Sequence, residues 1–260
     1  MDLSSVAVPH TLAKLARLLP LPPARILEAG CGRGALAAAL IELGYQVIGV
    51  DRDEDQVEAA RERGVPVIRA DVRDVSGEYD VVLFTRSLHH AENLDEILSH
   101  AAGLLAPRGR LVVEEFAWER VDPAAAGFLH DNRALLVAAG LLDAEELDGD
   151  PLDAWVSTHD FLHQGPDMLA ALGRHGTELT TVDTPMLWRL VDGRGGTWTA
   201  PAARAAGILA TIRLAEERRI AAGTLPAIGF LAAIRRLTAR EGYEKPCFHS
   251  AQNAVTRCEK

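Results

Sequence analysis

The stretch RILEAGCGRG, residues Arg25–Gly34, decides the fold of this chain of 260 residues. It starts with an apolar run and ends in three glycines at alternate positions. A helical run from Ala35 to Leu43 follows and Gly44 ends it. A second apolar run, Gln46 to Val50, then leads directly to Asp51. Strand, glycine-rich turn, helix, strand and acidic residue together predict one βαβ unit.

Each residue type in this unit has a physical role. Glycines tolerate positive φ and leave the backbone open to a ligand, and the helix behind them offers unpaired N–H groups. Asp51 can accept hydrogen bonds from both hydroxyls of a ribose, so the unit is suited to a nucleoside. The turn also satisfies the dinucleotide fingerprint through Gly30, Gly32 and Ala35. Glu28 weighs against that alternative, because its carboxylate repels a pyrophosphate and suits an ammonium or sulfonium ligand.

The segment Glu28–Gly34 resembles motif I of class I S-adenosylmethionine-dependent methyltransferases, whose pattern is acidic-x-Gly-x-Gly-x-Gly. The resemblance implies S-adenosyl-L-methionine as the cofactor and S-adenosyl-L-homocysteine as its product. It places Glu28 and the glycines Gly30, Gly32 and Gly34 around the methionine part, and Asp51 on the ribose. The resemblance is strong from Arg25 to about Phe116, which is a little over a third of the chain.

The next strand, predicted over Pro66–Ala70, ends at Asp71. The acidic residues Glu28, Asp51 and Asp71 thus fall at the ends of three successive strands, the edge at which open α/β sheets bind ligands. The resemblance implies that Asp71 binds the adenine amino group, with the backbone of Val72 beside it. The other interpretation is that Asp71 simply caps a turn. The remaining cofactor-binding candidates are neighbours of these motifs: Cys31, Arg52, Thr85 and Arg86.

A fourth strand, Tyr79–Phe84, runs into Thr85-Arg86-Ser87-Leu88-His89-His90. This segment resembles the Leu-His-His sequence found after strand four in small-molecule methyltransferases. His89 and His90 are therefore the first candidates for a catalytic base, because imidazole titrates near neutral pH. Glu115, at the end of the fifth strand, is the third candidate. Their structural alternatives are a cap or cofactor contact for His89, core packing for His90 and solvent exposure for Glu115.

Residues 119–165 are predicted to form a helical insertion after strand five. The aromatic and histidine side chains here, with little aliphatic filler, are more typical of a pocket lid than of a core. Trp118, His159 and His163 are the substrate-binding candidates. A base–carboxylate pair of His159 with Asp160 is disfavoured, because neighbours in sequence do not face each other on a helix.

The fold class that follows is α/β, with a Rossmann-like, mostly parallel, seven-stranded sheet and an inserted helical cap after strand five. We expect five segments, listed here by residue number: 1–24 an N-terminal helix, 25–118 the cofactor-binding half, 119–165 the cap, 166–240 the C-terminal half of the core, and 241–260 a mobile tail. In related methyltransferases the sixth and seventh strands form a hairpin, whereas here a predicted helix from Ala200 to Gly223 separates them.

Composition narrows the function classes. The formal net charge is −10, which disfavours binding to nucleic acid, and no apolar run is long enough to span a bilayer. A start without a basic region or long apolar core predicts a cytoplasmic protein. The cysteines at 31, 247 and 258 do not suggest a disulfide framework. Cys247, His249 and Cys258 lack the paired spacing of a zinc site, so no metal is expected.

The predicted function is methylation of a small molecule at O, N or C. Two alternatives use the same unit: a protein that binds the cofactor without methylating, such as a cyclase or binding module, and an NAD(P)-dependent oxidoreductase. The second should lack Glu28 and Asp71. RNA methylation is further disfavoured by the absence of an Asn-Pro-Pro-Tyr-type motif after strand four. The acceptor, and the choice between monomer and homodimer, stay open.

Overall fold

The computed structural model describes residues 4–145, 149–192 and 196–236. The predicted tail 241–260, with Cys247, His249 and Cys258, lies outside the described residues. The helices and strands that position the site are, in chain order, α1 (Ser4–Leu15), β1 (Arg25–Ala29), α2 (Ala35–Glu42), β2 (Gln46–Asp51), α3 (Glu54–Glu62), β3 (Val67–Arg69), β4 (Tyr79–Thr85), α4 (Leu94–Gly103), β5 (Leu105–Phe116), α5 (Pro123–Ala138), β6 (Leu142–Asp143), α6 (Pro151–His159), α7 (Gly165–Arg174), β7 (Thr177–Thr184), β8 (Thr197–Trp198), α8 (Ala202–Ala221) and β9 (Gly229–Arg235).

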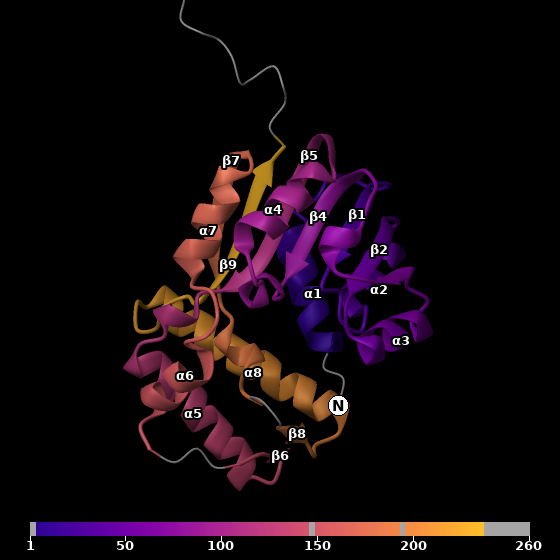
Figure 1. Ribbon diagram of the computed structural model, residues 1–260. Coiled ribbons are helices and arrows are strands. Elements are labelled where there is room, and N and C mark those ends of the chain that lie inside the picture. Colours follow the sequence, from indigo (N-terminus) through magenta and orange to yellow (C-terminus); the bar gives the residue numbers. More distant parts are fainter. Residues whose placement is uncertain (1–3, 146–148, 193–195, 237–260) are drawn as a thin grey trace, which may run out of the picture.

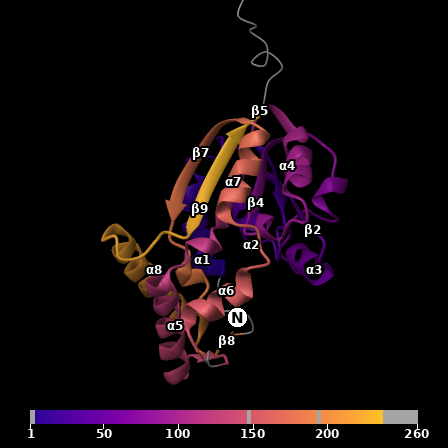
Figure 2. The ribbon, with the colours of Figure 1, turned by 60° about the vertical axis from the view of Figure 1, so that its left-hand side comes forward.

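The main sheet has seven strands in the order β3-β2-β1-β4-β5-β9-β7. The pairs from β3 to β5 are parallel, and β9 is antiparallel to both of its neighbours, β5 and β7. Figures 1 and 2 show the strands side by side with helices on both faces. The predicted fold class is confirmed. Although α8 separates β7 from β9 along the chain, the two strands still pair, in the register Thr184 opposite Gly229.

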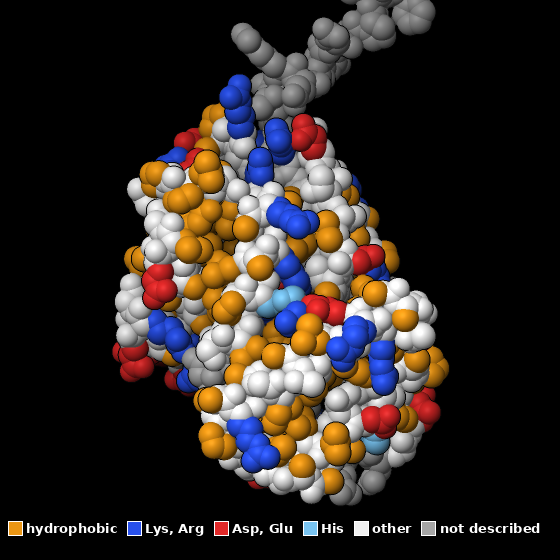
Figure 3. Space-filling model, turned by 180° about the vertical axis from the view of Figure 1, so that it is seen from behind, with side chains coloured by type: hydrophobic (Ala, Val, Ile, Leu, Met, Phe, Trp, Pro, Cys, Tyr) orange, Lys and Arg blue, Asp and Glu red, His pale blue; other side chains and the backbone are white. Residues whose placement is uncertain are grey.

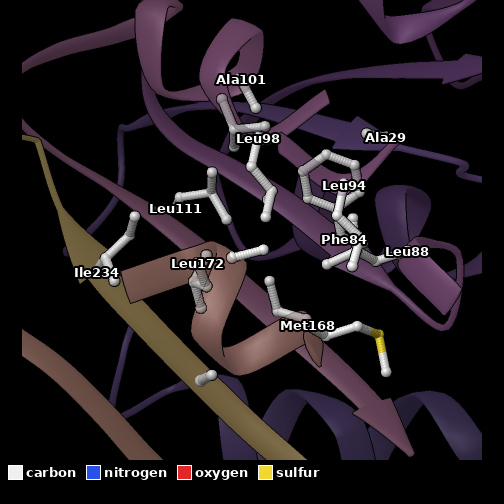
Figure 4. Packing of buried hydrophobic residues seen from close by; sticks show 14 of the residues in the cluster. Ala29, Phe84, Leu88, Leu94, Leu98, Ala101, Leu111, Met168, Leu172 and Ile234 are labelled. Carbon is white, nitrogen blue, oxygen red and sulfur yellow. The ribbon is translucent and has the colours of Figure 1, made fainter. Parts of the chain in front are cut away.

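Two hydrophobic clusters cover the two faces of the sheet. One face packs against α4 and α7, with Leu98, Met168 and Leu172 fully buried (Figure 4). The other face packs against α1, α2 and α3, where Leu15 and Leu40 are fully buried. The sequences of the central strands are almost entirely apolar because helices cover both faces of the sheet. This three-layer packing fixes the sheet edge on which the acidic residues and the histidines lie.

Local signals explain several helix starts. Asp53, the residue before α3, accepts a hydrogen bond from Gln56 N at 3.0 Å, and Asn93, the residue before α4, accepts one from Glu96 N at 3.1 Å. Both bonds satisfy N–H groups that a helix leaves free at its start. Gly34, at φ 71°, precedes α2, and a Cβ built on it would lie 2.9 Å from the Cβ of Ala60. This glycine is therefore required by the packing of α3 on α2.

A third cluster forms the cap, which Figure 1 shows below the sheet, across the ends of the parallel strands. It contains α5 and α6, but also α8 and the short β6–β8 sheet. The predicted cap, 119–165, is thus only its first half. The second half comes from residues that the sequence pattern assigns to the core, and Glu216 of α8 holds it by accepting three backbone N–H groups at 2.8–2.9 Å.

The fifth strand, β5, begins at Leu105 and includes the turn Pro107–Arg110, in which Arg108 has φ 67°. Helix α5 ends at Ala138, and Leu142 of β6 pairs with Trp198 of β8. Within the described ranges, no helix is long and apolar enough to cross a membrane, and no three metal-ligating side chains cluster.

Candidate functional site

Three cavities adjoin where the parallel strands end. The first, of about 310 Å³, is lined by residues that include Asp51, Asp71, Val72 and His90. The second, of about 500 Å³, is lined by residues that include Glu28, Gly30, Gly32 and Glu114. The third, which we call the cap chamber, measures about 480 Å³ and lies between the sheet edge and the cap, with a lining that includes His89, His90, Trp155 and His159. Arg86 lines all three, so they meet just after β4.

Glu28, on β1, lies at the bottom of the second cavity and is only 1% exposed. Its Oε1 accepts a hydrogen bond from Thr85 Oγ1 at 3.2 Å, whereas Oε2 has no partner among the described residues. Burial raises the pKa of Glu28 to about 8, against the smaller opposing effects of Thr85 and Arg86. An unpartnered buried carboxyl oxygen is costly, and a cationic ligand in the second cavity would remove that cost.

Asp51 ties the glycine-rich turn to the end of β2. Its Oδ2 accepts from Gly32 N at 2.8 Å and its Oδ1 accepts from Asp53 N at 3.0 Å. These bonds hold the carboxylate at the edge of the first cavity, where it can also accept from hydroxyl groups. Cys31, in the same turn, lines the second cavity, and burial raises the pKa of its thiol to about 12, so it is not a nucleophile at neutral pH.

Asp71 lines the first cavity together with Val72. Its carboxylate receives the Arg73 side chain in a two-pronged pair, Nε at 2.9 Å and Nη2 at 3.0 Å, and also accepts from Arg73 N at 2.9 Å. The hydrogen-bonded guanidinium lowers the pKa of Asp71 to about 2. Arg52 lies 3.6 Å from the same carboxylate and is 63% exposed. Asp71 is therefore both a turn cap and a fixed acceptor at this cavity.

Glu115, at the end of β5, is completely buried and binds the segment after β4. It accepts from Leu88 N at 2.7 Å and from His89 N at 3.3 Å, and its Oε2 lies 2.6 Å from His89 Nδ1. Because the carboxylate already accepts these backbone N–H groups, we assign the Nδ1 proton to His89. Nε2 is then the ring nitrogen that can accept a proton. This is the geometry of a base oriented by a carboxylate.

The other histidines differ in position. His90 is exposed, lines the first cavity and the cap chamber, and has its ring centroid 4.2 Å from that of His89. His159 also lines the chamber and stacks on Trp155 at 3.7 Å. His163 does not line it and instead bonds Ala91 O through Nε2 at 2.7 Å.

Trp118 lies in the hydrophobic core of the cap rather than in the lining of the chamber. Its Nε1 donates to Leu162 O at 3.1 Å, and its own carbonyl accepts from Trp155 Nε1 at 2.9 Å. The structure therefore brings His89, His90, Glu115 and His159 together, whereas Trp118 and His163 support the walls around them.

Comparison with known families identifies the chain. The family described as "Methyltransferase domain" matches residues 7–149, more than half of the sequence. The chain belongs to this methyltransferase family. The match covers the glycine-rich turn and all three acidic strand ends, so the family predicted from Glu28–Gly34 is confirmed.

Curated relatives of the methyltransferase share only part of its length. The 27-O-demethylrifamycin SV methyltransferase of Amycolatopsis mediterranei (strain S699) is 32% identical over 152 residues, which cover 52% of this chain and 54% of that protein. A ubiquinone biosynthesis O-methyltransferase of Rhodopseudomonas palustris (strain TIE-1) is 33% identical over 100 residues, 34% of this chain and 38% of that protein. The chain thus spans about half the length of the first relative and less of the second.

Solved structures support the fold. An S-adenosylmethionine-dependent methyltransferase from Mesorhizobium loti aligns with a TM-score of 0.56 at 18% identity, over 90% of this chain and all of that one. Geranyl diphosphate C-methyltransferase from Streptomyces coelicolor A3(2), solved with S-adenosyl-L-homocysteine, aligns with a TM-score of 0.55 at 16% identity, over 88% of this chain and 76% of that one. At these identities the likeness concerns the fold alone.

One group that sequence reasoning did not select is the buried charge cluster around Glu114. Thr11 Oγ1 donates to Glu114 at 3.0 Å, and Lys14 Nζ and Arg189 Nη1 each lie 3.7 Å away. Burial alone would raise the pKa of Glu114, but the charges of Arg189 and Lys14 outweigh it and lower the pKa. The Glu114 side chain is only 1% exposed, and Figure 3 shows basic and acidic side chains among hydrophobic ones on the surface at the back of the molecule. In the sequence, two adjacent glutamates at the end of an apolar strand could have indicated this buried cluster.

A second missed residue is Arg133, in the middle of α5. It lies four residues after Leu129 on a largely apolar helix face, and both line the cap chamber. The helical spacing of its apolar neighbours predicts that this position is buried. A lone arginine at a buried position could have indicated a functional residue.

Proposed function

We propose that this methyltransferase transfers a methyl group from S-adenosyl-L-methionine to a small-molecule acceptor held in the cap chamber. The observation that carries the proposal is the meeting of three cavities at Arg86. Two of them carry the acidic residues suited to a cationic nucleoside, and the third is lined by His89, whose ring is held by the buried Glu115. A small molecule fits a chamber of about 480 Å³.

The chain's own residues fit the cofactor. A cation in the second cavity would bind favourably to the buried carboxyl oxygen of Glu28, which has no partner among the described residues. Asp51 and Asp71 present fixed hydrogen-bond acceptors in the first cavity. We propose that Glu28, Gly30 and Gly32 hold the methionine part and that Asp51, Asp71 and Val72 hold the adenosine part, with Cys31, Arg52, Thr85 and Arg86 completing the walls. Gly34 contributes through helix packing instead. When bound, the cofactor supplies a methyl group already activated by a positive sulfur.

The residues of the chain then have two tasks, alignment and proton removal. Alignment of reacting groups can contribute about 7–11 kcal/mol to a rate, and the cap supplies it by holding the acceptor against the end of β4. We propose that His89 accepts the acceptor's proton at Nε2, while Glu115 is the positioning residue that keeps Nδ1 protonated. His90 and His159 lie in the same chamber and contact the acceptor. A positioned base contributes about 10²–10⁴-fold.

The test is calorimetric binding of S-adenosyl-L-methionine, S-adenosyl-L-homocysteine and NADPH, with Asp51→Ala as the variant. We expect both sulfur compounds to bind and their affinity to fall at least about tenfold in the variant, because a ribose acceptor is lost. Binding of NADPH alone would contradict the proposal and favour an oxidoreductase. Formation of methylated product then separates an enzyme from a protein that only holds the cofactor.

A further inference from the structure

The cap chamber has two kinds of wall. One is aromatic and apolar: His159 stacks on Trp155, and the Phe116 ring lies edge-on to both, with centroids 6.0 and 6.5 Å away. The other carries guanidinium groups: Arg86 just after β4, Arg133 from α5 and Arg189 from the turn after β7. A ligand that satisfies both walls has an apolar, ring-sized body and a negative charge.

The three arginines differ in their surroundings. Arg86 is exposed to solvent, and its charge acts to lower the pKa of Glu114. Arg189 lies 3.7 Å from the Glu114 carboxylate and also donates to Ala7 O at 2.9 Å, so its charge is compensated inside the protein. Arg133 is only 9% exposed, and its Nη1 donates to a neutral carbonyl, Asp192 O, at 2.9 Å. Its Nε has no hydrogen-bond partner among the described residues.

Arg133 is therefore a buried cation outside any ion pair of the described residues. Of the carboxylates in the described ranges, none lies within 4.0 Å of its guanidinium. The Asp192 carboxyl, which also lines the chamber, interacts with Arg133 only beyond that distance, and burial raises its pKa. An unpaired buried charge costs several kcal/mol. A ligand anion at Arg133 would recover part of that cost.

The chemistry of the anion follows from the number of buried cations that lie outside an ion pair. A single guanidinium of this kind matches a monoanion, whereas a phosphate near neutral pH carries close to two charges. The planar fork of arginine fits the two oxygens of a carboxylate. We propose that the acceptor of this methyltransferase is an aromatic or apolar carboxylic acid whose carboxylate binds Arg133 in the cap chamber. This inference rests on the proposed function, because the chamber is its acceptor site.

The experiment uses 2-naphthoate and its neutral amide, 2-naphthamide, which share one ring system and differ in charge. Their affinities are measured by calorimetry on the full chain saturated with S-adenosyl-L-homocysteine. We expect the acid to bind at least about tenfold more tightly than the amide, since a charge-assisted hydrogen bond contributes about 1.5–3 kcal/mol. The preference should vanish in Arg133→Gln and persist in part in Arg133→Lys, which keeps the charge but loses the fork.

Arg174→Gln is the matched control, because Arg174 is a half-exposed arginine on α7, paired with Asp95 and outside the chamber. It should leave the preference unchanged. Equal affinities for acid and amide in the unaltered protein, absence of binding by both, or a preference that survives Arg133→Gln would each overturn the assignment. The proposed function fails separately, if S-adenosyl-L-homocysteine does not bind at the first step.

Discussion

Glu28→Gln offers a direct test of the buried acid at the centre of the site. The folded chain raises the pKa of this carboxyl from 4.5 to about 8, chiefly because it is buried. The unfolded chain exposes it to water and restores its ordinary value. The folded state therefore holds a proton that the unfolded state has lost between these two pH values, so stability falls as the pH rises.

The size of the effect follows from the pKa difference. The stabilisation relative to a non-titrating glutamine is complete below pH 4.5 and is lost as the pH rises through about 8. From pH 6 to pH 8 the unaltered protein should lose about 2 kcal/mol relative to Glu28→Gln, since each pKa unit corresponds to about 1.4 kcal/mol. The glutamine also places an unpartnered N–H group beside Thr85, which adds a constant offset but no pH dependence in this range.

The assay is urea unfolding of the unaltered protein and the variant at pH 6, 7 and 8, in which the free energy of unfolding is extrapolated to water. The quantity of interest is how the difference between the two proteins changes with pH. Glu78→Gln is the matched control, because Glu78 is 56% exposed and paired with Arg25 at the surface. It should show little such change. A Glu28→Gln difference that stays constant from pH 6 to pH 8 would refute the reasoning, because Glu28 would then be ionised in the free protein.

Three further predictions follow from the same geometry. Binding of S-adenosyl-L-homocysteine near pH 7 should release about one proton as Glu28 ionises beside the ligand's cation, measured by calorimetry in buffers of different ionisation enthalpy; no buffer dependence would contradict it. Gly34→Ala should lower the free energy of unfolding by about 1–3 kcal/mol more than Gly64→Ala, because both glycines have positive φ but only Gly34 is crowded; equal losses in urea unfolding would refute the packing argument. Glu115→Gln should slow product formation about 10²–10⁴-fold without changing S-adenosyl-L-homocysteine affinity, because an amide beside His89 Nδ1 moves the proton to Nε2; unchanged turnover would exclude this base.

Local sequence patterns were enough to predict the fold from β1 to β5. Alternate glycines, apolar runs and the acidic strand ends Glu28, Asp51 and Asp71 are such patterns, and the ends of parallel strands must meet at one edge of a sheet. The sequence offered both His89 and Glu115 as candidate bases, but it did not predict that Glu115 is buried and binds His89. The fold class followed from these short-range signals, which depend on backbone geometry and period.

The face that each side chain takes, and the segments that build the cap, depend on tertiary contacts. Glu114 and Glu115 are neighbours, yet they serve opposite faces of the sheet, because successive strand residues point opposite ways. The cap joins segments before and after β7 that share no local pattern, so its second half was not predicted. Arg133 is a candidate for binding an anion only because it is buried and no described carboxylate lies within 4.0 Å of its guanidinium. Such pairings depend on contacts between residues far apart in the chain, and hydrophobic periodicity does not record them.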